Sequence, residues 1–128
     1  ITGEGEILIT SSAVITVSSL GFEELPTVIN GSATTIDWAE STKQSLTLQN
    51  NTILAFNSID DAGDGNTTAH LVLLLEYSGA YDVTFSDSVI NWPGQLTPDL
   101  SGESGTVHIV TFYYRDGQYY GNVVFDYE

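Results

Sequence analysis

The densest group of possible metal ligands in this 128-residue chain is the acidic loop 60–66, with the sequence Asp-Asp-Ala-Gly-Asp-Gly-Asn. Carboxylate and amide oxygens are the ligands of Ca²⁺, which takes about six to eight of them. The loop lacks the alternating acidic spacing and the terminal Glu of an EF-hand loop. Its Gly, Asp and Asn content is also typical of a solvated turn, which is the structure we expect there.

Two histidines, His70 and His108, fall in segments expected to be strands. They could form a pH-sensitive pair or part of a metal site, but no third ligand is tied to them by spacing. The chain has no Cys, so it forms neither disulfides nor thiolate metal sites. We therefore expect hydrogen-bonded histidines within a sheet, with no metal and no cofactor.

Paired carboxylates occur at Glu23-Glu24 and at Asp60-Asp61, and a pair of acids is the machinery of glycoside hydrolysis. Adjacent acids are also the usual composition of a solvated surface. Ser-His-Asp catalysis would need a nucleophile elbow, and the sequence contains no Gly-x-Ser-x-Gly. We expect no enzymatic activity.

The charge balance excludes several classes of partner. Seventeen acidic residues stand against only Lys43 and Arg115, for a formal net charge of −15. Affinity for nucleic acid depends on Lys and Arg neutralising phosphates, and anionic membranes repel acidic proteins in the same way. We expect neither nucleic acid nor membrane as a partner. The 41% content of hydrophobic residues still indicates a folded chain, and its length fits one domain.

The elements that must position these residues are strands, because no segment of ten or more residues shows a convincing period of 3.6. Runs rich in β-branched and aromatic residues alternate with turn signals instead. This pattern predicts an all-β fold, an antiparallel β-sandwich or jelly-roll-like domain. The expected strands are 7–10, 13–17, 34–38, 44–49, 52–56, 69–75, 81–85, 106–114 and 118–125.

Three turn signals set the expected connections. Asn50-Asn51 predicts a tight hairpin that presents Leu46, Leu48, Leu54 and Phe56 together on one wall of the core. Asp116-Gly117 predicts a type I′ hairpin between the last two strands. In Trp92-Pro93-Gly94, proline fixes its own φ and glycine permits the next turn, which predicts a rigid corner.

Segments 71–75 and 106–114 are apolar on both faces. Such strands are covered on both sides, either at the centre of a sheet or against another subunit. The C-terminal tyrosines, together with Trp92, could complete a core, form a subunit interface or contact a ligand. These tyrosines are Tyr113, Tyr114, Tyr119, Tyr120 and Tyr127.

The chain divides into two expected parts at the Asn30-Gly31 turn signal. Residues 1–31 are expected to form an N-terminal strand arm or hairpin, and residues 32–128 the β-sandwich domain. The sequence contains no Met, which we interpret as a sign of processing, trimming or a fragment.

An ordered series of motifs carries a family resemblance. The motifs are Thr35-Ile36-Asp37-Trp38, Gln44 to Leu48 with Asn51 to Phe56, Leu71 to Leu75, Val83 to Phe85, Ile90-Asn91-Trp92-Pro93-Gly94, Pro98-Asp99-Leu100, Val107 to Phe112 and Asp116 to Gly121. In this order and spacing, over residues 33–127, the chain resembles a β-domain common in tailed-bacteriophage virion proteins. Members of that family often read Trp-Pro-Gly-Gly, whereas this chain has Gln95 in place of the second glycine.

The resemblance implies a non-enzymatic structural protein of the virion, assembled in the host bacterial cytoplasm and often trimeric. The leading hypothesis is a capsid decoration or cement protein whose N-terminal arm docks onto neighbours by strand addition. Its partners would be other copies in a homotrimer and other virion proteins, the major capsid protein or tail components. The alternative is the receptor-binding tip of a tail fibre that contacts host glycan. The expected interface residues are Ile7, Ile9, Ile15, Val17, Trp92, Tyr113, Tyr119 and Tyr120.

Overall fold

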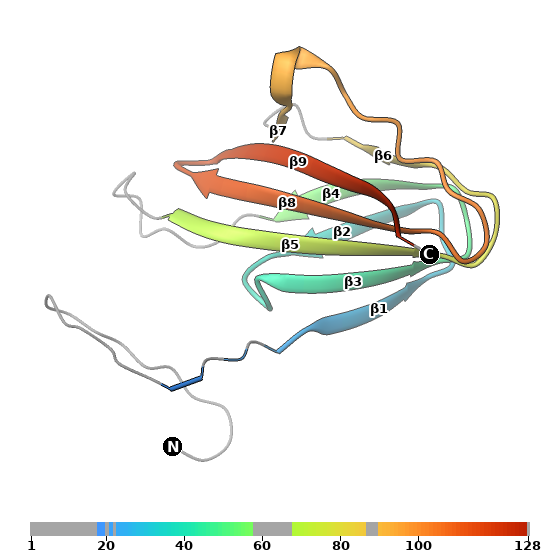
Figure 1. The fold of residues 1–128 in the computed structure, drawn as a ribbon, viewed down its shortest axis with the longest axis horizontal. Helices are drawn as coiled ribbons and strands as arrows, with labels where there is room; N and C mark the ends of the chain where they lie inside the picture. The colour runs from blue at the N-terminus through green and yellow to red at the C-terminus, as the bar shows by residue number, and fades with distance from the viewer. Residues whose placement is uncertain (1–17, 20, 22, 58–67, 87–89, 128) are drawn as a thin grey trace, which may run out of the picture.

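The computed structural model describes residues 18–19, 21, 23–57, 68–86 and 90–127 (Figure 1). The acidic loop 60–66 and the strands expected at 7–10 and 13–17 lie outside this part of the chain. Strands make up most of the described residues, as predicted, and their one helix is the 3₁₀ turn η1 (Pro93–Gln95). The described strands are β1 (Leu25–Ile29), β2 (Ala33–Asp37), β3 (Lys43–Leu48), β4 (Thr52–Asn57), β5 (Thr68–Tyr77), β6 (Val83–Phe85), β7 (Ile90–Asn91), β8 (Val107–Arg115) and β9 (Gln118–Tyr127).

The strands form two sheets that lie one behind the other in Figure 1. Sheet A has the order β1-β3-β5-β8-β9-β7, and sheet B has the order β2-β4-β6. The first six strands alternate between the two sheets, so the chain winds through three coils, and the neighbours within each sheet are parallel. The antiparallel pairing expected from sequence is wrong for these strands. Among the described strands, only the pairs β5 with β8 and β8 with β9 are antiparallel.

The hairpin predicted at Asn50-Asn51 is also wrong, because β3 and β4 lie in different sheets. A type I′ turn needs positive φ angles, and neither asparagine has one. Their side chains connect neighbouring coils instead. Asn50 Nδ2 donates to the backbone oxygen of Asn30 (3.2 Å), and Asn51 Oδ1 accepts from the backbone N–H of Asp82 (2.9 Å). The turn therefore carries the chain across from one sheet to the other.

The hairpin predicted at Asp116-Gly117 is confirmed. Both turn residues have positive φ, 49° for Asp116 and 77° for Gly117. The β8 and β9 strands pair on either side of this turn, and β8 also pairs with β5. Strand β5 is therefore an interior strand of sheet A, between β3 and β8, as its apolar composition indicates.

The core lies between the two sheets and is centred on Phe112. Its ring contacts Phe56 from sheet B (centroids 5.2 Å apart), Trp38 (6.1 Å) and Trp92 (5.9 Å) in edge or tilted geometry. Such aromatic contacts add stability beyond the area that they bury. The aliphatic part of the core comes from alternate positions of the strands: Ile29, Ile36, Leu46, Leu48, Leu54, Leu71, Leu73, Leu75, Val83 and Val110.

Strand β1 belongs to the body of the domain rather than to a separate arm. Its residues Leu25–Ile29 pair in parallel with β3, and Ile29 is 2% exposed. The part of the expected arm before residue 18 lies outside the described residues.

The Trp-Pro-Gly corner is present as expected. Trp92 is extended (φ −106°, ψ 149°), Pro93 starts η1, and Gly94 has φ 64°. The next residue, Gln95, also has a positive φ of 60°. A glycine at this position would adopt the same conformation without the clash that a Cβ causes there.

Gln95→Gly is therefore expected to raise the free energy of unfolding by about 1 kcal/mol, because it removes the left-handed strain at this position. Chemical denaturation measures the change. Gln95→Ala is the matched control: it shortens the side chain but keeps the Cβ, so its stability should stay near that of the wild type. Equal stability of the Gly and Ala variants would contradict this account of the corner.

Candidate functional site

One face of sheet A packs on sheet B, and the other, here called the outer face, points away from it (Figure 1). Side chains alternate between the two faces along each strand. On β8, for example, Phe112 and Tyr114 are buried, while Thr111 and Tyr113 are exposed. The apolar and aromatic residues of the outer face, assigned by this alternation and by the strand register, are Val28, Val72, Leu74, Val107, Ile109, Tyr113, Tyr120, Val124 and Tyr127.

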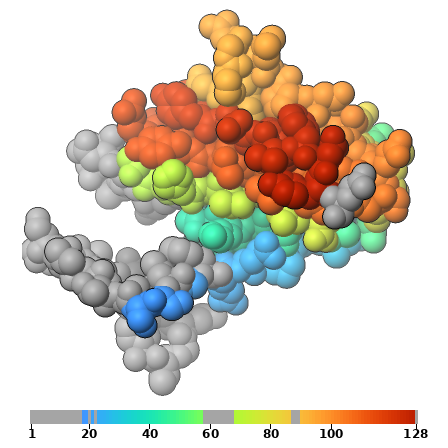
Figure 2. Space-filling model, in the orientation of Figure 1, coloured from blue at the N-terminus to red at the C-terminus, as the bar shows by residue number. Residues whose placement is uncertain are grey.

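The outer face is exposed to a degree that is unusual for such residues. Val28 is 56% exposed, Val124 51% and Tyr127 46%, whereas Leu74 and Ile109 in the middle of the sheet are half-buried. Figure 2 shows this face, with the colours of β3, β5, β8 and β9 crossing it side by side. A group of exposed apolar side chains on one face of a domain marks a site of interaction.

The outer face also carries most of the chain's positive charge. Lys43 and Arg115 are the only Lys and Arg in the sequence, and both occupy outward positions, on β3 and β8. Among the described residues that alternate onto this face, Glu76 is the single carboxylate. An acidic chain of net charge −15 thus presents one sheet face that is nearly free of acid.

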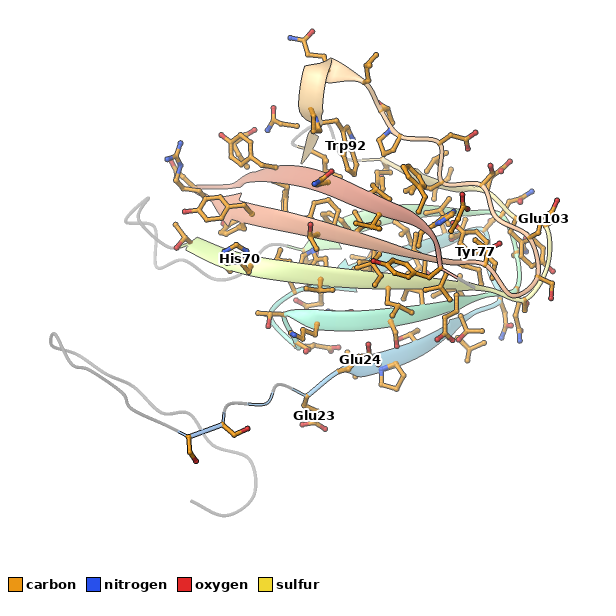
Figure 3. All side chains as sticks on the ribbon, in the orientation of Figure 1. Glu23, Glu24, His70, Tyr77, Trp92 and Glu103 are labelled. Carbon is orange, nitrogen blue, oxygen red and sulfur yellow. The ribbon has the colours of Figure 1, made fainter. Side chains whose placement is uncertain are left out.

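The two histidines lie on opposite faces of sheet A, so they do not form the pair that was the alternative to hydrogen-bonded sheet histidines. His70 is exposed on the outer face, where its ring meets the Tyr113 ring edge-on (5.5 Å), and Figure 3 shows it at one end of β5. His108 is 1% exposed and points into the core. The five-residue offset between their paired positions on β5 and β8 separates them further along the sheet.

His108 is the hydrogen-bonded sheet histidine that the sequence predicted. Its Nε2 lies 2.8 Å from the backbone oxygen of Ser101, and its Nδ1 accepts from the backbone N–H of Asp126 (3.1 Å). Because Nδ1 accepts, Nε2 is the ring nitrogen that donates to the Ser101 oxygen. This histidine ties the end of β9 to the loop before β8.

Tyr77 anchors the same loop from β5. Its hydroxyl donates to the backbone oxygen of Leu100, and its ring lies where a Cβ on Gly102 would sit. Burial, more than the nearby charges of Asp82 and Asp99, raises the pKa of the Tyr77 phenol well above its ordinary value. The phenol is therefore a fixed donor. The backbone N–H of Ser101 donates a hydrogen bond to Asp99 Oδ1 (3.0 Å), and this bond lowers the pKa of the Asp99 carboxyl.

A broad depression of about 540 Å³ lies beside this loop and has a polar, acidic lining. Asp82, Glu103 and Asp126 approach it from three separate segments. Their carboxylates do not converge, since no group of three or more His, Cys, Asp or Glu in the described residues could hold a metal ion. The depression is open and offers solvated charge rather than a ligand cage.

The expected interface residues are divided by the structure. Tyr113 (40% exposed) and Tyr120 (44%) lie together on the outer face, paired across β8 and β9. Tyr119 is 1% exposed because it alternates inward on β9. Trp92 is half-buried and lies over Gly121. Both side chains therefore pack in or against the core. Ile7, Ile9, Ile15 and Val17 lie outside the described residues.

The paired acids Glu23 and Glu24 are exposed just before β1, as Figure 3 shows, and Glu40 lines the same shallow pocket. Asp60-Asp61 lies outside the described residues. No helix in the described ranges is long and apolar enough to cross a membrane.

Sequence reasoning identified the double-faced strands but missed the charged residues of the outer face. Lys43, Glu76 and Arg115 come from three strands, and only the pairing of β3, β5 and β8 places them on one surface. Alternation along the strands could have identified them, because each of these three residues is next to a buried residue on its own strand and so points to the opposite face. It assigns a face only when the neighbouring strands are known.

The fold and this surface define the class of the protein: an all-β domain of two sheets that exposes one apolar, acid-poor sheet face. No protein-family model, curated protein or solved structure matches the chain.

Proposed function

We propose that this chain is a non-enzymatic structural protein of a tailed-phage virion, most simply a capsid decoration or cement protein. The observation that carries the proposal is the outer face. It is an apolar surface on a two-layer scaffold, and its exposed side chains, such as Val28, Val124 and Tyr127, are of the kind that mark a site of interaction. In a structural role, this face binds another protein subunit of the assembly.

The ordered motifs from Thr35 to Gly121 add a second line of support, through their resemblance to virion β-domains. The corner and the C-terminal hairpin, two of these motifs, are formed in the structure. In the proposed role the protein is an oligomer, with a homotrimer as the form that the resemblance implies. It attaches to the capsid through the apolar N-terminal segment and works in the assembled virion.

Deletion of residues 1–21 is expected to abolish attachment to capsids of the parent virion, because strand addition by this segment supplies backbone hydrogen bonds and apolar contacts. Co-sedimentation with undecorated capsids measures attachment. A variant of 128 residues with the substitutions Ile7→Ser, Ile9→Ser, Ile15→Ser and Val17→Ser separates the loss of apolar side chains from the loss of chain length, and it should behave like the deletion. Thermal unfolding shows whether each variant keeps its fold. Unchanged attachment of the deletion variant would rule out the arm.

The second candidate is the receptor-binding tip of a tail fibre. A specific observation favours it: a small groove of about 170 Å³, lined by Trp92, Pro93, Leu96 and Phe125, lies beside the corner. Aromatic and apolar walls of this kind can stack against sugar rings. Glycan-array binding that is lost on Leu96→Glu, a substitution at a 76% exposed side chain, would favour this function over capsid decoration.

A further inference from the structure

We propose that the outer face is the surface on which a second copy of this chain packs, face to face. The inference deepens the proposed structural role, since it names the partner of the outer face. Identical copies of net charge −15 repel one another, so they can associate closely only through a surface that is poor in acid. Among the described parts of the chain, the outer face has this property and also carries the only Lys and Arg of the sequence.

The outward positions of sheet B are also poor in acid, with Asp37 as their one carboxylate, but they carry neither Lys nor Arg, and Ile53 is their one large apolar side chain. The other described regions are acidic. Asp82, Glu103 and Asp126 line the depression at one end of the molecule, and Glu23 and Glu24 lie beside β1. Like charges brought directly together across an interface repel one another strongly, so contact through these regions is disfavoured. On the outer face, Lys43 and Arg115 outweigh the one acid, Glu76.

The arrangement of the charges sets the orientation of the two copies. Glu76 lies near one end of β5, and His70 lies about 20 Å away near the other end, at about 3.3 Å per residue. Arg115 is beside this second end, since its partner on β5 is Thr68. With the β5 strands of two copies antiparallel, Glu76 of each copy meets the His70 and Arg115 end of the other.

The same orientation buries the apolar centre of the face. Val72 and Leu74 lie between Glu76 and His70 on β5, so Leu74 of one copy faces Val72 of the other. Ile109 pairs with Leu74 and Val124 pairs with Ile109, which continues the apolar row across β8 and β9. The contact is isologous and forms a dimer, in place of the homotrimer that the resemblance implies: the same patch serves both copies and every charge pair occurs twice.

The first test places a new acid in the interface. Light scattering of the full chain at micromolar concentration is expected to show an oligomer for the wild type. Val124→Glu should raise the dissociation constant about tenfold or more, because each copy then brings a carboxylate to the apolar row. Ile53→Glu is the matched control. Ile53 is 50% exposed against 51% for Val124, but it lies on β4 in sheet B. Thermal unfolding confirms that both variants are folded.

The second test exchanges the charges. Glu76→Lys and Arg115→Glu should each weaken self-association when alone, since each variant sets like charges opposite one another. An equimolar mixture of the two variants should restore association to near the wild-type level, because every pair is then of opposite sign. Restoration requires direct contact between these positions in two copies, so a general effect of net charge cannot produce it.

The proposal is overturned by a monomeric wild type, by equal effects of Val124→Glu and Ile53→Glu, or by a mixture that fails to restore association. These results are independent of the capsid test. A chain that attaches to capsids as a monomer overturns this inference and the oligomeric form, but it leaves capsid decoration in place. A chain that self-associates through the outer face but does not attach to capsids overturns the proposed function and leaves this inference in place.

Discussion

Phe112→Ala is expected to lower the free energy of unfolding by about 3–5 kcal/mol, the range for aromatic truncation in a packed core. Phe112 is 1% exposed and meets rings of both sheets, including Phe56, Phe85 and Trp92. Its removal leaves a cavity between the sheets that these rings can fill only in part. Chemical denaturation followed by circular dichroism measures the loss.

The matched control is the next residue on the same strand. Tyr113 is 40% exposed on the outer face, so Tyr113→Ala should cost less than about 1 kcal/mol, as surface substitutions usually do. On our inference it should weaken self-association instead. Similar losses of stability for the two variants would contradict the assignment of the inner and outer faces of β8.

Gly121→Ala is expected to destabilise the domain by about 1–3 kcal/mol or more, as overpacking does in a filled core. A Cβ on Gly121 would lie 2.4 Å from Cζ3 of Trp92, closer than atoms in contact can come. The Trp92 ring, and with it the corner that ends at Leu96, must move away from β9. Chemical denaturation reports the stability.

A double-mutant cycle with Trp92→Ala identifies the cause of this loss. Once the indole is removed, Gly121→Ala should cost much less, so the two effects should depart from additivity by more than about 0.5 kcal/mol. Additive effects would show that Gly121 is required for another reason. Asn122→Ala, at an exposed neighbouring position on β9, controls for changes in the strand itself.

The corner and the last hairpin were predictable because their signals are local. Asp116-Gly117 supplies two residues that accept positive φ, and Pro93 fixes its own backbone angle. Likewise, alternation along 106–114 assigned Phe112 to one face and Tyr113 to the other before any pairing was known. Within the described residues, the all-β content followed from the same period of two.

The path between the sheets was not predictable in this way. Asn50-Asn51 has the composition of a tight hairpin, and Leu46, Leu48, Leu54 and Phe56 are core residues in either arrangement. The choice depends on partners far along the chain: β3 pairs with β1 and β5, and Asn50 and Asn51 bind the backbones of Asn30 and Asp82. A two-residue turn carries no information about those contacts.

The candidate site shows the same division. The sequence by itself determined that strands 71–75 and 106–114 are apolar on both faces, and that Lys43 and Arg115 are the only strong cations of an acidic chain. Only the tertiary structure decided that these features share one surface. The register aligns Lys43 with Val72 and Thr68 with Arg115, and it depends on pairing between strands that are far apart in the sequence, which no local pattern encodes.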